Sequence, residues 1–168
     1  MGSPLPGPAV FGHAGAIIDN VLLYCDGATT TTETFKISKI NTYTGCFLGQ
    51  INVINPKRIA WQQWVHPTDV GKYKMAAYAD LERSTITFLG GSEKLHDFAG
   101  KTQNQQPLMD NQGIWVFDLN KNSWQVINST STAFDLNSVV EFENQFWILG
   151  GMKANGDISP STIGLPSK

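Results

Sequence analysis

The chain has 168 residues, of which 41% are hydrophobic and 15% are charged, and its net charge is -2 from 12 basic and 14 acidic residues. This composition is typical of one folded domain with a packed core and excludes a disordered chain. No basic run exceeds two residues, which excludes the usual electrostatic footprint of a nucleic-acid-binding protein. No apolar stretch is long enough for a membrane helix, so no membrane span is expected.

The first ten residues, MGSPLPGPAV, have neither the charged start nor the apolar stretch of a signal peptide, which favours a cytoplasmic location. Cys25 ends the apolar run VLLYC, so we expect it to be a buried free thiol. Cys46 lies in a Gly/Thr-rich stretch that suggests an exposed thiol, and two cysteines are too few for a disulfide framework. The tripeptide starting at Asn128 is a glycosylation sequon, a pattern that also arises by chance and does not decide the compartment.

Three segments share one pattern, in which an apolar run, a tight polar turn, a second apolar run and a glycine follow one another. They are AGAIIDNVLLYCDG at 14–27, MAAYADLERSTITFLGG at 75–91 and LNSVVEFENQFWILGG at 136–151. Runs of this length, rich in β-branched and aromatic residues, predict paired strands joined by short turns. We place these pairs at 14–18 with 21–25, at 74–79 with 84–89 and at 137–142 with 145–149.

A second pattern follows each of the first two segments. It reads VINPKRIAW at 53–61 and VFDLNKNSW at 116–124, and its tryptophan lies 34 residues after Gly27 in one copy and 33 after Gly91 in the other. Two markers at a nearly constant offset indicate a repeat of four strands. The third and fourth strands are expected at 48–54 with 59–65 and at 113–118 with 123–127. No run has a convincing 3.6-residue apolar period, so we expect almost no helix.

These residues resemble the kelch repeat, in which an apolar run ending in Gly-Gly precedes an apolar run with Asp and a spaced Trp. Here ITFLGG precedes VFDLNKNSW, WILGG closes the third segment, and FGHAGAIIDNVLLYCDG opens the first with Asp26-Gly27 in place of Gly-Gly. The resemblance covers roughly residues 11–152. It implies an all-β fold, a partial kelch-type β-propeller made of four-stranded antiparallel blades.

On this reading the chain divides into an N-terminal tail (1–10), a first blade (11–70), a second blade (71–130), a half blade of two strands (131–152) and a C-terminal tail (153–168). Propellers contain about four to eight blades, so two and a half blades leave the ring open. We expect the chain to be a fragment of a longer propeller. The alternatives are a ring completed by a homo-oligomer and a short open stack.

The repeat also assigns structural roles. Glycines after the second strand allow the positive φ needed where the chain turns out of a crowded sheet, and the spaced tryptophans are expected to be wedges between neighbouring blades. The residues with these roles are Gly27, Gly90, Gly91, Gly150, Gly151, Trp61 and Trp124.

The connections of such blades differ between the two faces. Those after the second and fourth strands are long and leave one face, whereas the other face carries turns of two to four residues. Long loops on a rigid scaffold commonly bind partners, and the stretch 92–112 is the richest in donors and aromatic anchors. The binding candidates on this long-loop face are His66, Lys72, His96, Asp97, Phe98, Lys101 and Gln103.

Kelch adaptors are protein-interaction scaffolds, so the resemblance implies a protein partner bound through the long-loop face. The alternative is a propeller fragment of a carbohydrate-active or copper-dependent, galactose-oxidase-like enzyme, which makes carbohydrate a second ligand class. Such copper sites use Tyr and His with a Cys-linked Tyr, and this arrangement cannot be mapped onto Tyr43 and Cys46. The histidines are far apart and no catalytic motif occurs, so we expect no catalytic residue, metal or cofactor.

Overall fold

Every regular element of the computed structural model is a β-strand within the part of the chain that it describes, which is residues 2–33, 36–95, 113–128, 139–152, 157 and 162–166. The strands are β1 (Ala14–Ile18), β2 (Val21–Cys25), β3 (Ala28–Glu33), β4 (Lys36–Thr42), β5 (Cys46–Ile51), β6 (Ile59–Trp64), β7 (Tyr73–Asp80), β8 (Thr85–Ser92), β9 (Gly113–Asp118), β10 (Ser123–Asn128), β11 (Val139–Phe142), β12 (Gln145–Leu149) and β13 (Thr162–Pro166). Within these ranges no helix is long and apolar enough to cross a membrane.

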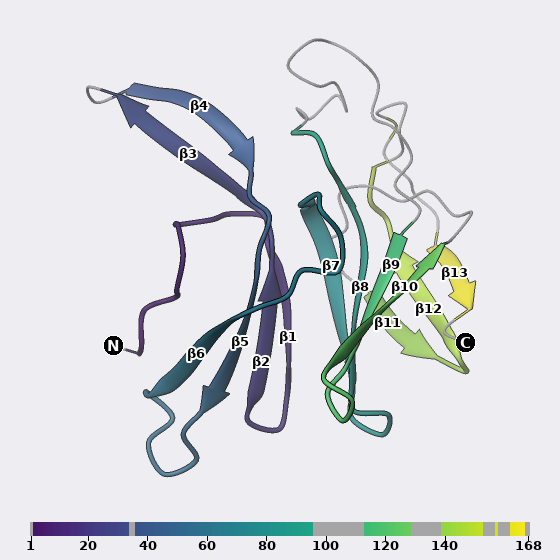
Figure 1. Cartoon of the computed structure of the whole chain (residues 1–168). Coiled ribbons are helices and arrows are strands. Elements are labelled where there is room, and N and C mark those ends of the chain that lie inside the picture. The colour runs from purple at the N-terminus through teal and green to yellow at the C-terminus, as the bar shows by residue number, and fades with distance from the viewer. Residues whose placement is uncertain are drawn as a thin grey trace.

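Apart from β3 and β4, which form a separate two-stranded sheet, the described strands form three antiparallel sheets that stand side by side (Figure 1), and we call them blades 1, 2 and 3. Blade 1 has the order β1-β2-β5-β6, blade 2 the order β7-β8-β9-β10, and blade 3 the order β11-β12-β13. The first strand of blade 2, β7, contacts the first strands of both neighbours, β1 and β11. The expected fold class is confirmed: the chain is an all-β, open portion of a β-propeller.

Three parts of the connectivity differ from the sequence-based expectation. Residues 153–168 are not simply a tail, because β13 (Thr162–Pro166) pairs with β12 and gives blade 3 a third strand. The connection from β5 to β6 spans residues 52–58 and is longer than the expected four residues, since β5 starts and ends earlier than predicted. The connection from β2 to β5 contains a hairpin, β3 with β4, that extends beyond the ends of the blade (Figure 1).

The main core lies in the seam between blades 1 and 2. Leu23 and Cys25 of blade 1 pack there against Ile86, Phe88 and other large side chains of blade 2. Trp124 belongs to the same seam, where its indole Nε1 donates a hydrogen bond to the carbonyl oxygen of Val65 at 2.7 Å. It therefore joins the last strand of blade 2 to the end of the last strand of blade 1.

A second core joins blades 2 and 3. Leu89 and Ile114 of blade 2 pack there against Val139, Phe146 and Ile148 of blade 3. At the turn end of this seam the Arg83 guanidinium reaches across the blades. Its Nη1 donates to Asp80 Oδ2 at 2.7 Å and to Glu141 Oε1 at 3.1 Å, and its Nη2 donates to Asn144 Oδ1 at 3.2 Å.

The two cysteines form a disulfide, so the expectation of two free thiols is wrong. Cys46 is the first residue of β5 and not part of a loop, and it pairs directly with Cys25 at the end of β2. Both side chains are fully buried. Directly opposed residues of antiparallel strands have their Cβ atoms close together, so the strand register itself brings the two sulfur atoms into bonding range.

The repeat glycines all have positive φ, between 67° and 103°. At Gly27 a Cβ would lie 2.8 Å from the carbonyl oxygen of Phe11, so a side chain would also collide with the N-terminal segment. Close approach and backbone conformation therefore both require glycine at this point.

Candidate functional site

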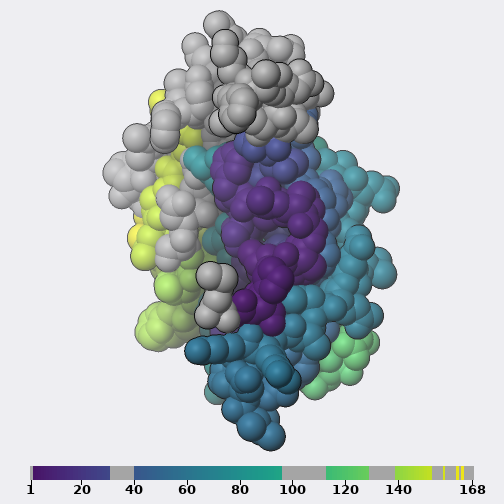
Figure 2. Space-filling view, turned by 90° about the vertical axis from the view of Figure 1, so that its left-hand side faces the viewer, coloured from purple at the N-terminus to yellow at the C-terminus, as the bar shows by residue number. Residues whose placement is uncertain are grey.

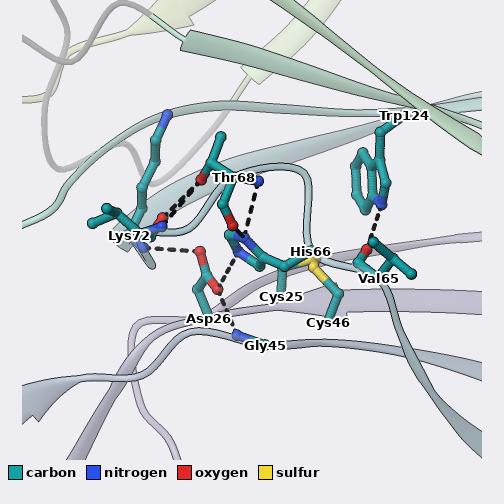
Figure 3. The surroundings of a disulfide bond; sticks show 10 residues. Cys25, Asp26, Gly45, Cys46, Val65, His66, Thr68, Lys72 and Trp124 are labelled. Carbon is teal, nitrogen blue, oxygen red and sulfur yellow. Dashed lines mark hydrogen bonds and ion pairs between the residues drawn. A yellow bond between two sulfur atoms is a disulfide. The ribbon is translucent and has the colours of Figure 1, made fainter.

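Two of the predicted binding residues, His66 and Lys72, lie at either end of the connection from β6 to β7. The structure brings both to the carboxylate of Asp26, which follows β2, at the long-loop end of the seam between blades 1 and 2 (Figure 3). The remaining five candidates, His96, Asp97, Phe98, Lys101 and Gln103, lie outside the described residues.

Asp26 is fully buried, and each of its carboxylate oxygens accepts hydrogen bonds. Oδ1 accepts one from the backbone N–H of Gly45 at 3.0 Å and one from His66 Nε2 at 2.8 Å, and Oδ2 accepts one from the backbone N–H of Lys72 at 2.8 Å. The N–H of Gly27 also donates to the Lys72 carbonyl oxygen at 3.0 Å. A buried carboxylate is tolerated only when it is paired and hydrogen-bonded, and here the two connections 43–45 and 65–72 supply the donors.

The imidazole of His66 is held at both nitrogens. Nε2 faces Asp26, while Nδ1 contacts the carbonyl oxygen and the amide nitrogen of Thr68. Burial alone would lower the pKa of His66, but the hydrogen bond to Asp26 and the negative charge of that carboxylate outweigh burial and raise the pKa above 6.5. The arrangement thus favours an imidazolium that donates to Asp26 and to the carbonyl oxygen of Thr68.

Lys72 is a buried cation whose side chain runs into the neighbouring blade. Its Nζ donates to the carbonyl oxygen of Gly113 at 2.9 Å and lies 4.3 Å from the ring centre of Trp115. Burial lowers the pKa of Lys72 to about 8, an effect that the negative charges of Glu93 and Asp26 only partly oppose. The His66 ring meets the same indole edge-on, with ring centres 5.0 Å apart.

We call Asp26, His66, Lys72 and Trp115 the Asp26 cluster. The carboxylate oxygens of Asp26, both nitrogens of His66 and Nζ of Lys72 have protein partners. The cluster ties the connection 65–72 and the start of β9 to the end of β2. The cluster is a rigid, hydrogen-bonded support beneath the long loops, and His66 is more exposed in it than Asp26.

Sequence reasoning missed Asp26 as a cluster member, because Asp26-Gly27 was interpreted as a substitute for the Gly-Gly of the repeat. A signal was present in the apolar run VLLYC directly before it. An acidic residue that ends a buried strand is expected to need several donors, and that requirement points to the neighbouring connections.

The described residues do not fit a copper site of the galactose-oxidase type. Cys46 is bonded to Cys25 and is therefore not available for a covalent link to Tyr43. Within the described ranges no three side chains of His, Cys, Asp and Glu gather as metal ligands would.

Comparison with known proteins places the chain at the level of the fold. No protein-family model matches the sequence, and no curated protein matches it. Among solved structures, YjhT superposes with a TM-score of 0.67 at 15% sequence identity, over 98% of this chain and 51% of that protein. A fungal alcohol oxidase of the AA5 family, solved in complex with copper, superposes with a TM-score of 0.64 at 12% identity, over 94% of this chain and 31% of the oxidase. The chain thus spans about half the length of YjhT and about a third of the oxidase, and at these identities the likeness concerns the fold alone.

Proposed function

We propose that the chain is part of a kelch-type propeller that acts as a protein-interaction scaffold and binds its partner through the long-loop face. The observation that carries the proposal is the asymmetry between the two ends of the blades. One end carries the β3–β4 hairpin and the connections 65–72, 93–112 and 129–138, whereas the connections at the other end span two to seven residues. The Asp26 cluster beneath the long-loop face supports the proposal, because rigid support lowers the entropic cost of presenting loops to a partner.

The test compares two loop exchanges in the full chain. In one variant residues 96–103 are replaced by a Gly/Ser sequence of the same length, and in the matched control residues 53–57 of the opposite end are replaced in the same way. Each variant is compared with the unaltered chain by quantitative cross-linking and mass spectrometry in its native extract. We expect partners to be lost only with the first variant. If both variants bind every detected partner equally, the proposal is wrong.

A second candidate is the propeller part of a carbohydrate-active or copper-dependent enzyme, and the likeness to the AA5 alcohol oxidase favours it. It receives less support from the residues, since Cys46 is held in a disulfide. Metal analysis of the purified chain, together with an assay for sugar and alcohol oxidation, separates the two candidates. Stoichiometric copper with turnover would favour the enzyme, and their joint absence would leave the scaffold.

A further inference from the structure

The outer face of blade 1, which points away from blade 2, carries side chains that a neighbouring blade would normally cover. A hollow of about 440 Å³ lies there, lined mainly by residues of β1 and β2. Aligning the repeat glycines and following the strand register gives the blade 2 position that corresponds to each of these lining residues. The corresponding pairs are His13 with Met75, Gly15 with Ala77, Ile17 with Ala79, Leu22 with Ile86, and Tyr24 with Phe88. Those blade 2 residues pack against blade 1. The hollow is therefore the place where a preceding blade would pack.

The two repeat tryptophans support the same conclusion. The ring centres of Trp61 and Tyr24 are 5.6 Å apart, and those of Trp124 and Phe88, at the matching positions, are 5.8 Å apart. Trp124 Nε1 donates to Val65 of the preceding blade, but Trp61 Nε1 is buried without a hydrogen-bond partner. A buried donor without an acceptor is costly, so this indole points to an occupant that brings one.

Blade 3 presents the complementary face. Val140, Phe142, Trp147 and Leu149 match Ala16, Ile18, Leu23 and Cys25 of blade 1, the residues that pack on blade 2. Phe142 is 65% exposed and Leu149 is 51% exposed. The outer face of blade 1 thus corresponds to the face with which blade 2 packs on blade 1. The outer face of blade 3 corresponds to the face with which blade 1 packs on blade 2.

A segment of the chain partly covers the outer face of blade 1. Residues 3–8, which we call the strap, lie across it (Figure 2). Tyr24 Oη donates to the carbonyl oxygen of Pro6 at 2.7 Å, and the N–H of Ser3 donates to the carbonyl oxygen of Lys57 at 2.9 Å. The strap also borders the hollow, since Leu5 is one of its lining residues, so a docking blade has to displace the strap, including its hydrogen bond to Tyr24.

We propose that the outer face of blade 1 docks the outer face of blade 3 from a second copy of this chain, so that two copies close one ring. The chain spans 51% of YjhT, so two copies have the length of one such propeller. Each copy contributes both faces, and the two contacts are equivalent head-to-tail interfaces that close by rotation.

The experiment uses one charge on each face. Ile17→Asp alters the blade 1 face and Phe142→Asp alters the blade 3 face, at side chains that are 47% and 65% exposed. Leu81→Asp is the matched control, because Leu81 is 65% exposed and lies in the turn between β7 and β8. Circular dichroism and unfolding midpoints verify that each variant is folded, and light scattering after gel filtration gives the mass over a concentration series.

We expect a two-copy species for the unaltered chain and for Leu81→Asp. Each face variant alone should raise the dissociation constant by at least about 30-fold, since a charge is buried unpaired in both interfaces of its ring. An equimolar mixture of the two face variants should associate again, because one of its two interfaces is unaltered on both sides. Tyr24→Phe removes the hydrogen bond to the strap and places in β2 the residue type that blade 2 has at the matching position, Phe88. This variant should associate more strongly than the unaltered chain.

Other outcomes contradict the proposal. A monomeric chain at every concentration would overturn it. So would a dimer that Ile17→Asp abolishes and Phe142→Asp leaves intact, since that pattern indicates a like-with-like contact of two blade 1 faces. Failure of the mixture to associate, with both variants folded, would exclude the head-to-tail arrangement.

Discussion

Asp26 holds together three segments that are far apart in the sequence, and the pKa values of its neighbours His66 and Lys72 shift in opposite directions although burial lowers both. The hydrogen-bonded imidazole of His66 has a raised pKa, whereas the ammonium of Lys72 has a lowered one. The carboxylate of Asp26 thus stabilises the positive charge of His66, whereas burial in the seam between blades 1 and 2 destabilises the positive charge of Lys72. The pH dependence of stability can separate the two effects.

His66 should stabilise the fold most in acid. Because its pKa is higher in the folded state than the usual 6.5, its contribution is fully present below about pH 6.5 and is lost as pH rises through the folded-state pKa. We expect the difference in unfolding free energy between the unaltered chain and His66→Gln to be largest near pH 6 and to shrink toward pH 8. Urea denaturation across this range measures it, and a difference that grows with pH would contradict the assignment.

Lys72 should behave in the opposite way. With a folded-state pKa of about 8 against 10.5 in the unfolded chain, the folded state loses its proton first, so stability from this group rises between these two pH values. The rise is worth roughly 3 kcal/mol at most. Lys72→Met should remove it, and denaturation of both proteins at pH 8 and pH 10.5 gives the comparison. Parallel curves for the two proteins would show that Lys72 is not buried as a cation.

At the scale of elements, the disulfide joins the two central strands of blade 1. It closes a loop over a sequence separation of 21 residues, for which loss of chain entropy in the unfolded state corresponds to roughly 3 kcal/mol. We expect Cys25→Ala with Cys46→Ala to lower the free energy of unfolding by about this amount.

Thiol titration of the denatured, unreduced protein provides the control for that experiment, and two free thiols would refute the bond.

The strands that sequence reasoning found are those with two apolar runs around a short polar turn, such as β1 with β2 and β11 with β12. It missed β13, whose sequence TIGLP contains the two residue types that weaken a strand. It missed the disulfide because Cys46 follows a Gly/Thr-rich stretch, and a start of β5 two residues later than the real one removes the pairing with Cys25. The Asp26 cluster depends on side chains from two connections and from strand β9, which no local pattern brings together.

At the scale of the whole molecule, the two seams are unequal. Large rings such as Phe88, Trp115 and Phe117 fill the seam between blades 1 and 2, whereas the described core between blades 2 and 3 is built from fewer and smaller side chains. In repeat proteins stability is close to a sum of single-repeat and neighbour terms. Blade 3 should therefore open before the other two blades.

Hydrogen exchange with mass spectrometry tests this order. We expect amides of β11 and β12 to exchange at lower free energies of opening than those of β2 and β8. Arg83→Met, which removes the contacts to Glu141 and Asn144, should lower protection in blade 3 and leave blade 1 unchanged. Uniform protection across the three blades would mean that the stack unfolds as one unit.

The position of Trp115 has an optical consequence. Its indole is 1% exposed and contacts both the imidazole of His66 and the ammonium group of Lys72. Nearby charges shift the emission of an indole and quench it. Of the five tryptophans in the chain, it is the one in contact with both titrating groups of the Asp26 cluster. The emission lost on Trp115→Phe should thus change with pH, and it offers a built-in fluorescence reporter for events on the loops above.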